Sequence, residues 1–121
     1  VLYVSIFASM VAEGLTPLAE KYALYNLYTV TNGAAAWLNK DGWLSGDPCD
    51  DSWFGVECVG SESTNGTDTD SNVTNVISIL LSRNTLIGTI PTTLYQLSKL
   101  ENLSLAFNEI YSDLSPSFGL L

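Results

Sequence analysis

The residues best suited to chemistry are two cysteines and two aspartates, in a chain of 121 residues that contains no histidine. Cys49 and Cys58 lack the C-x-x-C spacing of a zinc site, and neither thiol has a histidine to act as its base. Without histidine, Ser-His-Asp and Cys-His catalysis are excluded as well. Asp68 and Asp70 form a D-x-D pair, but the other oxygen ligands of a calcium loop are missing, which favours a solvated acidic loop. The sequence therefore predicts no catalytic centre, no metal site and no cofactor.

The charge balance is strongly acidic. Four Lys and Arg residues stand against thirteen Asp and Glu residues, which gives a net charge of −9. Nucleic acid is excluded as a partner, because binding to phosphates needs a basic patch. The acidity instead suits the surface of a soluble extracellular domain. The chain has no initiating methionine, so we expect it to be a fragment of a longer protein.

The last third of the chain repeats a pattern of apolar residues and asparagines with a period of 24 residues. The first copy is marked by Val76, Ile79, Leu81, Asn84, Leu86, Gly88, Ile90 and Pro91, and the second by Leu100, Leu103, Leu105, Asn108, Ile110, Ser112, Leu114 and Ser115. Self-similarity at such a period is typical of solenoids, in which each unit must stack on its neighbours to bury its apolar face. Because an amide both donates and accepts, Asn84 and Asn108 are expected to form a ladder that satisfies the backbone of adjacent coils.

The pattern L-x-x-L-x-L-x-x-N-x-L-x-G-x-I-P resembles a leucine-rich repeat of the plant type. The resemblance implies an α/β solenoid, a right-handed coil with parallel strands on its concave face. Repeat 1 is expected at 76–99 and repeat 2 at 100–121, where Ser112 and Ser115 replace the glycine and proline of the pattern. The chain stops where a third coil would begin, so we expect the natural array to continue.

The preceding region, 16–60, resembles the cap that precedes plant-type repeats. A helix is expected from Pro17 to about Thr31, with Thr16 as its N-cap and tyrosines at helical spacing; this helix is similar to caps of microalgal members. It is followed by a tryptophan segment and by D-P-C…W-x-G-V-x-C, which ends at Cys58. The resemblance implies a Cys49–Cys58 disulfide that holds Trp53, Phe54 and Val56 over the end of the first coil. A disulfide in turn implies an oxidising compartment.

Two further segments bear on localisation. The first 15 residues are largely apolar and too short to span a bilayer alone, so they are expected to be the end of a signal peptide or part of a membrane anchor. Segment 61–75 is expected to be an exposed polar loop. N-glycosylation is expected at three acceptor triplets, which begin at Asn65, Asn72 and Asn102. The protein is therefore expected to be secreted or membrane-anchored, on the extracellular or lumenal side.

The concave strand face is the expected binding site for a protein, peptide or glycan. Its outward positions are Ile77, Ser78, Leu80, Ser82, Arg83, Glu101, Asn102, Ser104, Ala106 and Phe107. Leu80 and Phe107 are candidate anchors for a partner, although Leu80 could instead pack under the cap or the polar loop. Arg83 is expected to be solvated or paired with Glu101 or Asp51. The resemblance implies a non-catalytic recognition module; the alternatives are the sensor ectodomain of a receptor-like kinase and a structural or adhesion surface protein.

Overall fold

The structure is a computed structural model that describes residues 16–60 and 73–111. Several expected features lie outside the described residues. They are the apolar segment 1–15, Asn65, Asp68, Asp70, Asn72, and the second repeat from Ser112 onward.

The N-terminal unit, residues 16–60, begins with two helices, α2 (Leu18–Val30) and α3 (Gly33–Ala36). The helix α2 lies within the predicted 17–31, but Pro17 is its N-cap and makes no side-chain cap bond. Thr16 does not cap α2, because its hydroxyl donates to the Asp47 carboxylate at 2.8 Å. Ala23, Leu24 and Leu27 form the buried side of α2. The chain leaves this helix through Asn32, which has a left-handed conformation.

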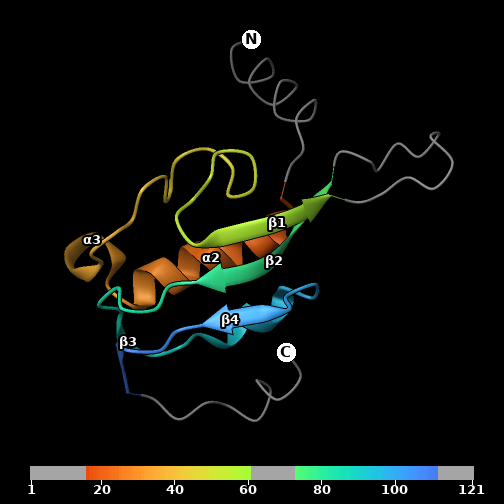
Figure 1. The fold of residues 1–121 in the computed structure, drawn as a ribbon. Helices are drawn as coiled ribbons and strands as arrows, with labels where there is room; N and C mark the ends of the chain where they lie inside the picture. The colour runs from red at the N-terminus through yellow and green to blue at the C-terminus, as the bar shows by residue number, and fades with distance from the viewer. Residues whose placement is uncertain (1–15, 61–72, 112–121) are drawn as a thin grey trace, which may run out of the picture.

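A sheet with the order β1-β2-β4 lies over α2 (Figure 1). The strand β1 (Val56–Gly60) pairs antiparallel with β2 (Thr74–Leu80), and β2 pairs parallel with β4 (Asn102–Ser104). β2 begins two positions before the expected start of repeat 1, because Thr74 and Asn75 pair with Gly60 and Val59. The loop expected at 61–75 is shorter by those two residues.

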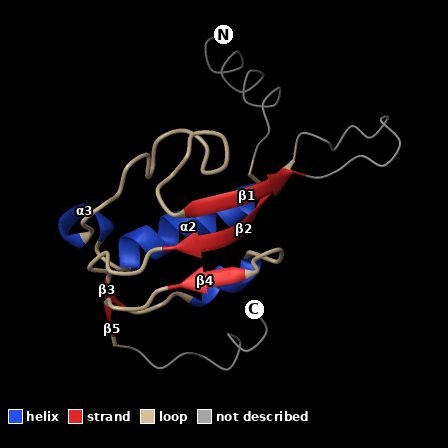
Figure 2. Ribbon diagram, in the orientation of Figure 1, coloured by secondary structure: helices blue, strands red, loops and turns tan. Residues whose placement is uncertain are grey.

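The two coils follow each other below the N-terminal unit (Figure 2). After β2 come β3 (Ile87–Gly88) and the 3-10 helix η2 (Thr92–Gln96), which packs against α2; after β4 comes β5 (Glu109–Ile110), parallel to β3. Gly88 has a φ of 142°, and a Cβ built on it would lie 2.3 Å from the carbonyl oxygen of Val30. A glycine is therefore needed where the first coil passes the end of α2.

The core runs without a break from the N-terminal unit into the coils. Trp43 packs edge-on against Trp37, at 4.7 Å between ring centroids, and at 5.1 Å from Trp53. These rings belong to one buried cluster with Ile79 and Leu81 of the first coil. The N-terminal unit and the repeats consequently share one hydrophobic core.

The structure joins Cys49 and Cys58 in a disulfide that closes a loop with a sequence separation of 9. A Cys49→Ser variant is expected to lose about 2–3 kcal/mol of unfolding free energy, because the unfolded chain regains the entropy of this loop. Thermal denaturation without reductant measures the loss, and wild type with reductant is the matched control. An unchanged melting temperature would show that the pairing contributes nothing.

Within the part of the chain that the structure describes, no helix combines the length and the apolar character needed to cross a bilayer.

Candidate functional site

The strand face is the side of the β1-β2-β4 sheet that points away from α2. Glu57, Ser78 and Asn102 are Cα partners across the three strands, so their side chains share this face. Leu80 and Ser104 form the next row. The alternate residue Ile79 is fully buried on the opposite side, against the core. The strand face is thus built of two adjacent rows, the first polar and the second centred on Leu80.

Leu80 is the exposed apolar residue of this face, with 42% of its surface accessible in the described structure. Its backbone N–H donates to the carbonyl of Gly55 at 2.7 Å. A Cβ on Gly55 would lie 2.4 Å from the Leu80 carbonyl oxygen, and Gly55 itself presents no side chain beside Leu80. Leu80 therefore lies beside the backbone of the N-terminal unit and keeps part of its surface accessible.

Ser78 was expected to be an exposed binding residue, and the structure corrects this. It is only 2% exposed and lies on the central strand, paired with Glu57 of β1 and Asn102 of β4. Its Oγ has no hydrogen-bond partner within the described part of the chain. Ile77 is half-buried at an irregularity of the β1–β2 pairing, where it has no Cα partner in β1. The accessible strand face is narrower than the sequence predicts.

A Ser78→Ala variant is expected to be as stable as wild type or more stable by up to about 1 kcal/mol, because it removes a buried hydroxyl that lacks a partner. Ser82→Ala is the matched control: the Ser82 hydroxyl is hydrogen-bonded to that of Ser104, and its loss should cost about 0.5–1.5 kcal/mol. Urea denaturation of both variants measures the difference. Equal losses in both variants would show that Ser78 has a partner after all.

At the end of the strand face, Arg83 and Phe107 occupy equivalent positions of the two coils. Both have left-handed backbone conformations, with φ of 56° and 59°. The Arg83 guanidinium lies over the Phe107 ring, 4.0 Å from its centroid, where a cation–π attraction holds it. Arg83 is therefore stacked rather than paired with Glu101 or Asp51. Phe107 keeps 70% of its surface exposed and remains accessible to a partner.

The remaining predicted positions lie on or next to β4, or follow the end of β2. Glu101, Asn102 and Ala106 are exposed, whereas Ser82 and Ser104 are half-buried and hydrogen-bonded to each other. The Glu101 N–H donates to the Ile77 carbonyl at 2.8 Å, which fixes its backbone on the first coil. Both Glu101 and Asn102 thus present polar side chains to solvent.

Asparagine side chains join successive units. The Asn84 amide, 2% exposed, accepts from the Asn39 N–H at 2.7 Å and donates to the Asn39 carbonyl at 2.8 Å. One coil further, Asn108 Oδ1 accepts from the N–H groups of Asn84 and Leu86, at 2.9 and 3.0 Å. Its Nδ2 donates to the Leu81 carbonyl at 2.8 Å. Each asparagine therefore satisfies backbone groups of the unit that precedes it.

Two buried carboxylates in the N-terminal unit were not predicted. Glu20, 3% exposed, accepts from the Val76 N–H and from the Asn75 amide, each at 2.8 Å, and so binds the start of β2. Asp47 accepts from Thr16 and from the N–H of Cys49. The sequence does contain a signal for Glu20, because it lies three and four positions before the buried Ala23 and Leu24 on the same side of α2.

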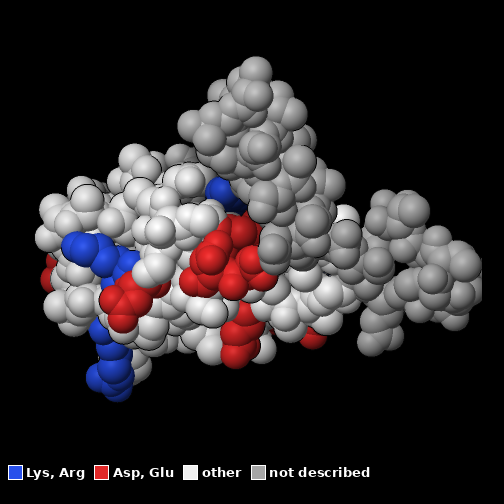
Figure 3. Space-filling model, turned by 90° about the horizontal axis from the view of Figure 1, so that it is seen from above, with Lys and Arg blue, Asp and Glu red and all other residues white. Residues whose placement is uncertain are grey.

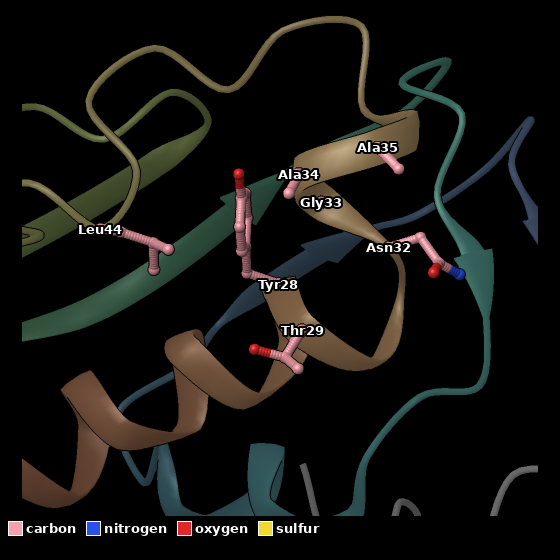
Figure 4. Close-up of a pocket in the computed structure, with 7 residues that line it drawn as sticks. All are labelled: Tyr28, Thr29, Asn32, Gly33, Ala34, Ala35 and Leu44. Carbon is pink, nitrogen blue, oxygen red and sulfur yellow. The ribbon is translucent and has the colours of Figure 1, made fainter.

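A shallow hollow lies at the end of α2 (Figure 4). It is lined by Tyr28, Thr29, Asn32, Gly33, Ala34, Ala35 and Leu44. No carboxylate, ammonium or guanidinium group lines the hollow, so it offers no charged side chain to a ligand. Within residues 16–60 and 73–111, no group of acidic or cysteine side chains is placed to hold a metal ion.

The stacked strands, the asparagine bonds and the disulfide-containing N-terminal unit define a leucine-rich repeat fold. No family model matches the chain. It is 31% identical over 98 residues to a probable leucine-rich repeat receptor-like protein kinase of Arabidopsis thaliana, a match that covers 72% of this chain and 9% of the relative. It is 37% identical over 91 residues to the LRR receptor-like serine/threonine-protein kinase GSO2 of A. thaliana, covering 65% of this chain and 7% of the relative. The chain thus spans less than a tenth of the length of these curated relatives.

Among solved structures, the leucine-rich repeat ectodomain of the receptor kinase SOBIR1 from A. thaliana has a similar fold. The TM-score is 0.64 at 22% identity, over 88% of this chain and 50% of that one. The chain belongs to the plant-type leucine-rich repeat proteins, as the repeat pattern indicates.

Proposed function

We propose that this chain is a non-catalytic recognition module whose strand face binds a protein, peptide or glycan on the extracellular or lumenal side. The observation that carries the proposal is the pair of exposed apolar side chains, Leu80 and Phe107, on a face otherwise lined by small and polar residues. Accessible anchors surrounded by polar groups are typical of binding surfaces. The Cys49–Cys58 disulfide supports an oxidising compartment.

In this proposal, residues 16–60 are the cap of a right-handed coil. Two contacts support that role. The strand β1 pairs along β2, which would otherwise present an unpaired edge. Glu20 also supplies the acceptor for the Val76 N–H at the start of the first coil. The N-terminal unit therefore occupies the edge and the apolar end that a repeat array must cover.

A second candidate is the sensor ectodomain of a receptor-like kinase. Both relatives favour it, since each is named as a receptor-like kinase. The complete reading frame decides: a downstream transmembrane segment followed by kinase motifs supports this candidate, and a stop codon after further repeats excludes it. Membrane attachment through segment 1–15 is a separate proposal, and it would argue against the usual order of a receptor kinase. A structural or adhesion surface protein is a third candidate.

Glycosylation is part of the proposed extracellular role. Asn102 is exposed on β4, so its amide is accessible in the folded chain. A glycan on Asn102 would stand on the strand face, whereas glycans on Asn65 or Asn72 would belong to the polar segment before β2. Peptide mapping after enzymatic release of N-glycans from the natural protein identifies which of the three asparagines carry them.

The binding proposal is tested by capturing ligands from an extract of the organism that makes the protein. The full chain and two surface variants serve as the bait. Leu80→Asp places a charge on the strand face and should abolish specific capture. Leu18→Asp is the matched control, because Leu18 is 81% exposed on α2, away from that face. Ligands retained by Leu80→Asp but lost by Leu18→Asp would place recognition on the helical side and contradict the proposal.

A further inference from the structure

We infer that the exposed side of α2 binds a neutral oligosaccharide through two adjacent hollows that share Thr29. The site is separate from the strand face, because that face points away from α2. The inference therefore adds a second ligand to the molecule and does not depend on the proposed recognition function.

The first hollow, which we call the tyrosine hollow, lies along α2 and holds about 260 Å³. It is lined by Tyr22, Tyr25, Asn26 and Thr29. These residues are three or four positions apart, so their side chains lie on one side of the helix. Tyr22 keeps 63% of its surface exposed, whereas Tyr25 is half-buried and packs edge-on against Trp53. The Tyr25 ring is thus held in place, and the Tyr22 ring is accessible to a ligand.

The polar groups of the tyrosine hollow are positioned to accept hydrogen bonds. Asn26 Nδ2 donates to the Thr93 hydroxyl at 2.9 Å. The Thr29 hydroxyl donates to the Tyr25 carbonyl at 3.0 Å. Within the described part of the chain, Asn26 Oδ1 and Thr29 Oγ1 accept no hydrogen bond, so both oxygens can take a donor from a ligand. A sugar ring carries hydroxyl donors on its rim and an apolar face of C–H groups, which suits a tyrosine ring.

The charge of the site favours a neutral ligand. Among the described residues, no charged side chain lines either hollow, so a phosphate or a cationic peptide would have no counter-charge there. Acidic side chains gather in the middle of the surface seen in Figure 3, and basic ones lie mainly toward one edge. Together with the net charge of −9, this distribution disfavours an acidic glycan. A purely apolar group would leave the amide and hydroxyl oxygens without donors.

The second hollow extends the site from Thr29 toward α3 and holds about 350 Å³ (Figure 4). Leu44 and Ala34 lie on either side of Tyr28 there, and Leu44 is 43% exposed. Pockets for drug-sized compounds measure about 300–1,000 Å³, so each hollow has room for little more than one ring. Two such hollows joined at a single side chain match two linked sugar rings.

The test is an NMR titration of the full chain with four neutral tetrasaccharides: cellotetraose, maltotetraose, mannotetraose and xylotetraose. We expect at least one of them to cause saturable shifts of the Tyr22, Asn26 and Thr29 amides, with a Kd of about 1 mM. Tyr22→Ala should weaken binding by about fivefold or more, because it removes the accessible ring. Tyr111→Ala is the matched control, since Tyr111 is 74% exposed and lines neither hollow; this variant should bind as wild type does.

Three results would overturn the inference. If Tyr22→Ala binds the tetrasaccharide as tightly as wild type, the tyrosine hollow is not the site. Saturable shifts confined to the strand face would place sugar recognition there, which the proposed function allows and this inference does not. If none of the four compounds shifts the α2 amides at about 10 mM, α2 does not bind neutral glycans. Millimolar ligands dissociate during the washes of a capture experiment, so that experiment judges the strand face separately.

Discussion

A Trp53→Ala variant is expected to lose about 3–5 kcal/mol of unfolding free energy, which is the usual cost of truncating a buried tryptophan. Trp53 is 1% exposed and packs edge-on against Tyr25, at 5.7 Å between ring centroids. It also lies 5.1 Å from Trp43, with the two ring planes tilted. Its indole N–H donates to the Ser45 carbonyl at 2.7 Å. Truncation would leave a cavity and a carbonyl without its donor, in the region that links the disulfide loop to α2.

Urea denaturation followed by tryptophan fluorescence and by circular dichroism measures this loss. Leu38→Ala is a suitable control, since Leu38 is 75% exposed and its truncation should change stability by no more than about 0.5 kcal/mol. A single transition with both probes is expected, because the aromatic cluster belongs to the same core as the first coil. A Trp53→Ala loss similar to that of the control would contradict a shared core.

An Asn84→Leu variant is expected to lose about 2–4 kcal/mol, although leucine has a similar size. The substitution removes two hydrogen bonds and leaves the N–H and the carbonyl of Asn39 without partners. Each buried polar group without a partner costs about 1–3 kcal/mol. The side chain itself is 2% exposed, so water cannot readily replace the amide.

Asn102→Leu is the matched control for this prediction, because Asn102 is an exposed asparagine of β4 and should tolerate the change within about 0.5 kcal/mol. Asn84→Asp adds a second comparison: its carboxylate can still accept from the Asn39 N–H but cannot donate to the carbonyl. We therefore expect an intermediate loss. Equal stability of Asn84→Leu and Asn102→Leu would show that the bonds to Asn39 do not hold the units together.

The sequence predicts those features that depend on local pattern. The period places Asn84 and Asn108 at equivalent positions, and amide chemistry then suggests how they serve neighbouring coils. The helix α2 was predicted to within one residue at each end, because Pro17 and Asn32-Gly33 bracket a helical pattern. These features need no knowledge of distant contacts.

Features that depend on distant contacts were missed. Val56–Gly60 has no alternating pattern, and its strand conformation depends on its pairing with β2. Ser78 is buried on a strand that lies between β1 and β4, a position that the sequence of β2 alone does not reveal. Glu20 would normally be assigned to solvent as a charged residue; its burial is compensated by two donors about 55 residues away. The Arg83–Phe107 stack likewise needs both coils in register.

Hydrogen exchange of backbone amides tests most directly whether the N-terminal unit and the coils form one folded unit. The Asn39 and Val76 N–H groups are bonded to the side chains of Asn84 and Glu20, whereas the Leu81 N–H is bonded to the Ser104 carbonyl, at 2.9 Å. We expect all three amides to exchange with the same free energy, that of global unfolding. If Asn39 and Val76 exchange through local opening while Leu81 remains protected, the N-terminal unit is only loosely attached, and its role as the cap is contradicted.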